Sequence, residues 1–117
     1  MTMKSEKLNL NKDFRRLYGR GRSQVHPLLV TYIILNRRGV IRYGITTGKK
    51  VGGAVERNRA RRVIEAAVRE NLQNVCCTGA DIVFVARSRT VLAKSQDVAA
   101  VMKKHFKAGG LIPQEKQ

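Results

Sequence analysis

The apolar residues of this chain fall into runs and spacings that predict three strands. Two runs rich in β-branched and aromatic residues, 28–35 and 40–46, flank a polar turn at 36–39, and this arrangement predicts an antiparallel hairpin. A third run, 81–86, is dominated by Val, Ile and Phe and is too short for a helix, which predicts a buried strand. The basic stretch 19–23 has no apolar alternation and predicts a loop.

Apolar positions spaced three and four residues apart predict three helices. The first lies between Asn11 and Gly19, the second begins at Ala54, and the third runs from Ser95 to the glycine pair 109–110. The apolar stripe of the second helix comprises Ala60, Val63, Ile64, Ala67 and Val68. On a helical wheel its opposite side carries Asn58, Arg62 and Arg69, with Arg59 and Arg61 on the flanks. This order of elements predicts an α/β (α+β) fold with helices packed on a small mixed sheet.

The length of the chain predicts a single domain, and its charge predicts a polyanionic partner. The 117 residues suit one domain, for which we expect an ordered core at about 9–108 and short polar tails. Lys and Arg number 24 against 8 Asp and Glu, so the net charge is +16, and a polyanion that relieves this self-repulsion is the natural partner. No apolar run approaches the roughly 18 residues of a membrane helix, and the polar N-terminus lacks a secretory signal. We expect a cytoplasmic protein that binds a polyanion, with no membrane partner and no obligate protein partner.

Side chains suited to acid-base or metal chemistry are few and scattered. His26 and His105 have no carboxylate partner at a recognisable spacing, and two adjacent cysteines, 76 and 77, do not match a zinc-ligand pattern. We therefore expect no catalytic residue and no metal site in the protein itself. The carboxylate of Glu65 is expected to form an ion pair along its own helix with Arg61, Arg62 or Arg69.

The segment 49–62 is the most informative part of the chain. It places six basic residues and one acid around a glycine-containing loop that leads into a helix N-terminus. Free helix N–H groups favour anions, and guanidinium groups match phosphate oxygens with two hydrogen bonds. The segment is therefore suited to a phosphate backbone. A merely solvated basic surface is the alternative, and the scarcity of compensating acids weakens it.

A second basic stretch, 4–22, interleaves seven cations with Phe14 and Tyr18. Aromatic rings can stack on unpaired bases while neighbouring cations hold the strand. Packing of Phe14 and Tyr18 in the core is an equal alternative. Tyr32, on a predicted strand, is likewise either a stacking residue or a packing residue.

The string KKVGGAVERNRARR at 49–62 closely resembles the signature of the bacterial ribonuclease P protein subunit, K-K-x-G-x-A-V-x-R-N-R-x-[KR]-R. The likeness extends to the first predicted helix at 13–19, to RYGI at 42–45 and to DIV at 81–83. The chain departs from the commonest family pattern at Gly48, where serine is frequent, and at Glu65 and Ala66, where Arg followed by an acid or Gln is frequent.

This resemblance implies a four-stranded sheet with three helices and a left-handed β-α-β crossover. It also implies an accessory subunit of an endoribonuclease, which binds a catalytic RNA and the 5′ leader of precursor tRNA while the RNA, with Mg²⁺, removes the leader. The residues implied to face the catalytic RNA are Lys49, Lys50, Arg57, Asn58, Arg59, Arg61 and Arg62, to which the helical wheel adds Arg69. The residues implied to hold the leader are Phe14, Tyr18 and Tyr32, with Arg15 beside them.

Two other functions remain open from the sequence. A ribosomal or RNA-chaperone protein without an enzymatic role suits the composition equally well. A nuclease that works without RNA would need acid-base residues, and the residue inventory argues against it.

Overall fold

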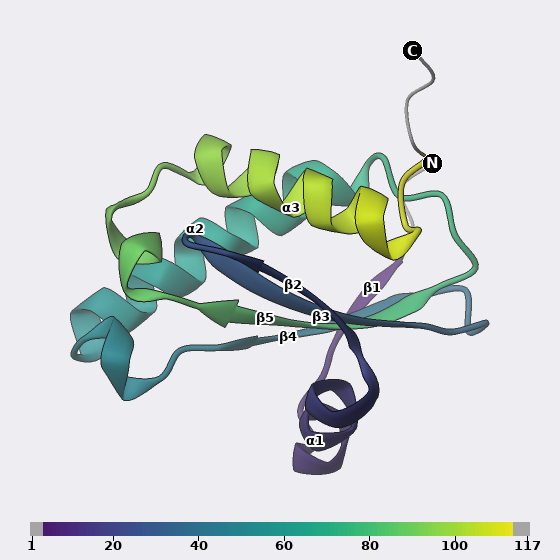
Figure 1. Ribbon diagram of the computed structural model, residues 1–117, viewed down its shortest axis with the longest axis horizontal. Coiled ribbons are helices and arrows are strands. Elements are labelled where there is room, and N and C mark those ends of the chain that lie inside the picture. The colour runs from purple at the N-terminus through teal and green to yellow at the C-terminus, as the bar shows by residue number, and fades with distance from the viewer. Residues whose placement is uncertain (1–3, 114–117) are drawn as a thin grey trace.

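The computed structural model describes residues 4–113 and shows one sheet with two helices on one face and one helix on the other (Figure 1). The strands are β1 (Ser5–Lys7), β2 (Arg22–His26), β3 (Leu29–Leu35), β4 (Ile41–Thr46) and β5 (Ala80–Ala86). The helices are α1 (Asn11–Arg20), α2 (Ala54–Leu72) and α3 (Ser95–Gly109), with short 3-10 turns η1 (Lys49–Val51) and η2 (Ser88–Leu92). The mixed α+β class with three helices is confirmed. The expected four strands are wrong, because the sheet has five in the order β1-β4-β5-β3-β2.

The predicted hairpin between β3 and β4 is also wrong. β5 lies between these two strands, antiparallel to β3 and parallel to β4. Six of the seven β5 residues are buried, so this strand takes the centre of the sheet, where both faces are covered. The turn after β3 therefore joins strands that are not neighbours. The parallel pair β4 and β5 is connected through α2, and the left-handed sense of that crossover stays a prediction.

The two strands that the apolar pattern missed form the edges of the sheet. β1 consists of three exposed residues that pair in parallel with β4. β2 pairs with β3 and begins at Arg22, within the stretch 19–23 that was predicted to be a loop, and none of its five residues is buried. An edge strand is held by backbone hydrogen bonds on one side and needs no apolar run, so its sequence carries little signal.

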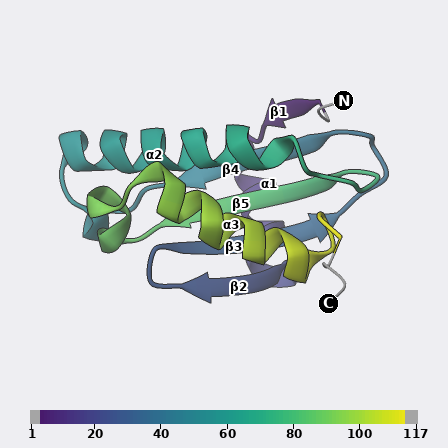
Figure 2. The same cartoon turned by 90° about the horizontal axis from the view of Figure 1, so that it is seen from above.

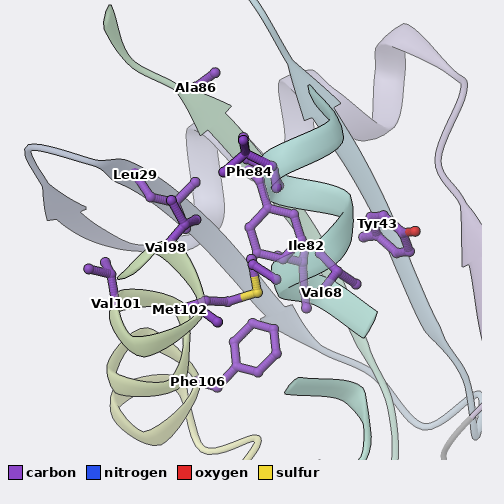
Figure 3. Close-up of a cluster of buried hydrophobic side chains, with 14 of the residues drawn as sticks. Leu29, Tyr43, Val68, Ile82, Phe84, Ala86, Val98, Val101, Met102 and Phe106 are labelled. Carbon is purple, nitrogen blue, oxygen red and sulfur yellow. The ribbon is translucent and has the colours of Figure 1, made fainter. Parts of the chain in front are cut away.

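The helices α2 and α3 lie next to each other over the sheet (Figure 2), and the main core fills the space between them and the strands. Phe84 of β5 sits at its centre, with ring centroids 6.1 Å from Phe106 of α3 and 6.0 Å from Tyr43 of β4 (Figure 3). The predicted apolar stripe of α2 is confirmed, since Ala60, Val63, Ile64, Ala67 and Val68 are all buried. His105 of α3 is buried beside Thr31, 2.8 Å from its hydroxyl, and burial lowers the pKa of this imidazole to about 4.

A smaller core holds α1 on the opposite face. Leu17 of α1 is fully buried against Leu8 and Val83, and several half-buried side chains surround these three. The helix ends at Arg20, one residue beyond the predicted Gly19, and the next residue packs closely: a Cβ on Gly21 would lie 2.4 Å from the Leu17 carbonyl oxygen. α1 thus covers part of this face and leaves the rest open.

A buried carboxylate ties α1 to the sheet. Asp81 of β5 is 1% exposed and accepts two hydrogen bonds from Arg42 of β4, at 2.9 and 2.6 Å, and one from Arg16 of α1 at 2.6 Å. The amide of Asn36 donates a fourth, at 2.8 Å. Burial alone would raise the pKa of Asp81, but the two guanidinium groups outweigh it and hold the pKa below its usual range.

We expect Asp81→Asn to lower the free energy of unfolding at neutral pH by about 3 kcal/mol, because it leaves two guanidinium groups without their buried counter-charge. The folded-state pKa of Asp81 is lowered, so this stabilisation is present above the unfolded value of 3.8 and is lost as the pH falls through the folded value. Urea unfolding at neutral and acidic pH measures both effects. Asp13→Asn is the matched control, because it also removes a carboxylate beside Arg16, but one that is half-buried and 3.3 Å away. Equal losses in the two variants would contradict this role of Asp81.

Candidate nucleic-acid interface

The side of α2 that faces away from the core presents basic and amide groups to solvent. Its apolar residues on the other side are buried, so the orientation of the helix follows from its 3.6-residue period. The exposed members of the predicted set on this helix are Asn58, Arg59, Arg61, Arg62 and Arg69, whereas Arg57 is half-buried. The structure therefore places most of the predicted RNA-binding residues of α2 on accessible surface.

Two of these arginines are fixed by contacts on opposite flanks of α2. Arg59 donates from Nε to the carbonyl oxygen of Val91, at 2.6 Å, on the side of η2. Arg61 donates to the carbonyl oxygen of Ile45, at 3.3 Å, and to the hydroxyl of Thr47, at 3.1 Å, on the side of β4. These contacts hold the two side chains across the helix surface and leave further N–H groups on each guanidinium for a ligand.

The turn η1 connects β4 to α2 and carries the predicted Lys49 and Lys50. Both lysines are exposed, while Val51 is buried in the main core and anchors the turn. Gly52 then adopts a φ of 138°, and a Cβ there would lie 2.8 Å from Cβ of Glu56. Glycine is required at this position, because other residues rarely adopt this φ and a side chain would collide with the first turn of α2.

The open part of the sheet beside α1 carries an aromatic pair. The rings of Tyr18 and Tyr32 meet edge-on, with centroids 5.1 Å apart and planes at 84°. The Tyr18 hydroxyl lies 2.9 Å from the hydroxyl of Thr46, and 42% of this residue is exposed. Phe14 is half-buried against the smaller core, where a Cβ on Gly44 would lie 2.5 Å from its ring. Of the predicted aromatic residues, Tyr18 is the most accessible and Phe14 is mainly a packing residue.

A hollow of about 390 Å³ lies where the carboxyl ends of β4 and β5 meet η1. Its apolar floor includes Val30 and Val85, and Lys49, Lys50 and Arg87 line it. Sequence reasoning missed both valines and Arg87. The sequence does place Arg87 directly after β5, and parallel strands end at the same edge of a sheet. Because β4 was predicted to pair with β3, however, the ends of β4 and β5 were not expected to meet.

Glu65 does not pair with the arginines of its own helix, so that prediction is wrong. Its carboxylate forms an ion pair with Lys7 of β1 and accepts a hydrogen bond of 2.8 Å from the Tyr43 hydroxyl. Burial would raise the pKa of Glu65, but these two hydrogen bonds outweigh it and lower the pKa. Glu65, which departs from the commonest family pattern, therefore joins the edge strand β1 to α2.

Groups for acid-base or metal chemistry are not clustered in the part of the chain that the structure describes. Within residues 4–113 no set of three or more His, Cys, Asp and Glu side chains could hold a metal ion. His26 accepts a hydrogen bond at Nδ1 from the backbone of Leu28, at 3.0 Å, and so serves the turn after β2. None of the helices in this range is long and apolar enough to cross a membrane.

Comparison with known proteins identifies the family. A family model described as Ribonuclease P matches residues 2–109. The chain belongs to the ribonuclease P family. It is similar to the ribonuclease P protein component of Clostridium botulinum strain Loch Maree, with 38% identity over 109 residues, 93% of this chain and 98% of the relative. The same component of Clostridioides difficile strain 630 is 42% identical over 91 residues, 78% of this chain and 80% of the relative.

Solved structures of the ribonuclease P family share the fold. The RNase P protein of Staphylococcus aureus superposes with a TM-score of 0.75 at 25% identity, covering 91% of this chain and 96% of that one. The RNase P protein of Thermotoga maritima gives a TM-score of 0.75 at 25% identity, covering 88% and 96%. The β4-α2-β5 unit and the α1 face of this chain therefore belong to a fold that the family shares.

In this ribonuclease P family member the predicted residues gather into two neighbouring surfaces. One surface is the exposed side of α2, and the other is the open sheet face at Tyr18 and Tyr32. The turn η1 lies between them, since Lys49 and Lys50 line the hollow at the end of β4. Arg15 is exposed on α1 and follows Phe14 in the sequence. Arg69 lies on the exposed side of α2, about four turns beyond the start of the helix.

The packing of Phe14 on β4 generates a prediction. Gly44→Ala should lower the free energy of unfolding by about 1–3 kcal/mol, because the added methyl group collides with the Phe14 ring. Adding Phe14→Leu should recover part of that loss, and urea unfolding of the single and double variants measures the coupling. Gly19→Ala is the matched control: nothing lies within 4 Å of the new methyl group, and the helix should become slightly more stable. Additive losses at residues 14 and 44 would contradict this packing.

Proposed function

We propose that this chain is the accessory protein subunit of ribonuclease P and binds the catalytic RNA and the 5′ leader of precursor tRNA during endonucleolytic removal of the leader. The observation that carries the proposal is the meeting of two chemically different surfaces at η1. A basic helix surface suited to phosphates lies on one side, and an open sheet face with accessible aromatic rings lies on the other. One small protein can thereby hold two RNA segments next to each other.

The exposed side of α2 is the surface that we assign to the catalytic RNA. Arg62 and Asn58 are exposed, and no hydrogen bond of their side chains is found within residues 4–113. The Arg62 guanidinium and the Asn58 amide can therefore donate to phosphate oxygens, contacts that do not read a base sequence. Arg59 and Arg61, whose side chains are held on the flanks, would widen the same phosphate-binding surface.

The open sheet face is the surface that we assign to the single-stranded leader. The Tyr18 ring is held edge-on by Tyr32 and by its hydroxyl at Thr46, so its outer face is fixed and accessible. A base that stacks there would continue towards the hollow with its apolar floor of Val30 and Val85. This mode tolerates any leader sequence, because every base offers a face for stacking.

The hydrolytic chemistry in this proposal belongs to the RNA, together with the Mg²⁺ ions that the RNA holds. The protein contributes positive charge and position. With a net charge of +16 it can offset the repulsion between closely placed phosphates, so that precursor and magnesium bind at lower ion concentration. We propose the cytoplasm as its location, because precursor tRNA is processed there. The family match favours this function over a ribosomal or RNA-chaperone role.

Reconstitution with the catalytic RNA tests the function. At low magnesium, leader cleavage should require both the RNA and this chain, and Arg62→Ala should weaken RNA binding and reduce its log-log salt slope by somewhat under one. Lys104→Ala, an exposed cation on α3, is the charge-matched control. Cleavage by the protein alone would indicate a protein nuclease. RNA binding without any effect on cleavage would support the chaperone alternative.

Tyr18→Ala tests the leader surface. The variant should weaken holoenzyme binding of leader-bearing precursor by about 1–3 kcal/mol while mature tRNA binds as before, because only the leader stacks on the ring. Tyr18→Phe keeps the ring, loses the 2.9 Å contact with Thr46, and should retain most of the affinity. Dissociation constants for the two RNAs measure this difference. Equal losses for precursor and mature tRNA would show that Tyr18 acts through the fold.

A further inference from the structure

A second hollow, of about 540 Å³, lies on the other side of α1 and belongs to neither surface described above. It opens between α1 and the turn that joins β3 to β4. Its lining residues are Leu10, Lys12, Asp13, Arg16, Arg38 and Arg42. The Tyr18 side of α1 faces Thr46 at the end of β4, whereas Arg16 faces Asp81 near the start of β5. α1 therefore separates this hollow from the aromatic face.

Two arginines at the base of the hollow are held in place by the buried Asp81. Arg42 uses Nε and one terminal nitrogen to bind both carboxylate oxygens, and within residues 4–113 its other terminal nitrogen makes no hydrogen bond. Arg16 binds through one terminal nitrogen, at 2.6 Å from Asp81 and 3.3 Å from Asp13. Each guanidinium thus has a fixed position with donors to spare, which is the preorganisation that a phosphate oxygen needs.

Two further cations at the rim take no part in holding the fold. The side chains of Lys12 and Arg38 are exposed and form no ion pair or hydrogen bond within the described residues 4–113. Four cations therefore line the hollow against two carboxylates, Asp13 and Asp81, an excess of two charges. Glu6 of β1 also acts on Arg42, and counting its carboxylate reduces the excess to one positive charge.

We propose that this hollow is a second phosphate site, which binds a phosphodiester group of an RNA strand other than the one that stacks on Tyr18. The inference rests on the proposed function, because that function makes RNA the polyanion at hand. Phe14 packs on Gly44 and closes the space beneath α1, so one strand cannot pass under the helix from one hollow to the other. The strand comes either from the catalytic RNA or from the distal part of a long leader.

The double variant Lys12→Ala, Arg38→Ala tests the site and leaves Arg16, Arg42 and Asp81 intact. Because neither replaced side chain holds the fold, the variant should unfold at the same urea concentration as the parent. Its control is Lys103→Ala, Lys104→Ala, which removes the same charge from exposed positions on α3. Binding is measured over a series of salt concentrations. Each lost phosphate contact should reduce the log-log slope by roughly 0.7–0.9, and the control should change the slope less.

Two arms identify the source of the phosphate. A reduced slope with catalytic RNA alone assigns the site to that RNA. A reduced slope only in holoenzyme binding of a precursor with a long leader, and not of one with a short leader, assigns it to the leader. An unchanged slope in both arms, or a loss equal to that of the control, overturns the proposal. Arg62→Ala in the same assays separates the two ideas, since its loss of RNA binding would uphold the proposed function even where the hollow fails.

Discussion

The ion pair between buried Asp81 and two arginines holds α1 on the sheet. The open sheet face on one side of α1 and the cationic hollow on its other side both depend on this interaction. Asp81 lies in the central strand and holds Arg16 of α1 and Arg42 of β4 at once. The apolar contacts beneath α1 are few, with Leu17 as the fully buried residue of the helix. Without the carboxylate, α1 would lose its main polar anchor. The open face at Tyr18 and the cationic hollow behind the helix exist because α1 is fixed between them.

The same cation type has two roles in this protein, and only contacts distinguish them. Arg16 and Arg42 neutralise a buried charge, so removing either one would weaken the fold as well as any ligand site. Arg62 is exposed and free to follow a phosphate. A net charge of +16 therefore overstates the charge available to RNA, because part of it is already used inside the molecule.

The central position of β5 brings the two proposed RNA surfaces together. Because β5 pairs in parallel with β4, the connection through η1 and α2 starts at the edge where Arg87 follows β5. Lys49 and Lys50 thereby lie at the end of the open sheet face and at the beginning of the basic helix. In an antiparallel β3-β4 hairpin, the end of β4 that leads into η1 would not lie beside the end of β5.

By itself the sequence determined the helices, the central strands and the family, because these depend on local spacing: the stripe from Ala60 to Val68 orients α2, and the string at 49–62 identifies the family. Only the tertiary structure decided the strand order and the edge strands. Strand pairing depends on which arrangement of the whole chain best buries its apolar side chains, and this is not visible in a local stretch of sequence. It also decided the partners of individual charges. Glu65 had three arginines at helical spacing and pairs instead with Lys7, which is 58 residues away along the chain and adjacent only in the folded sheet.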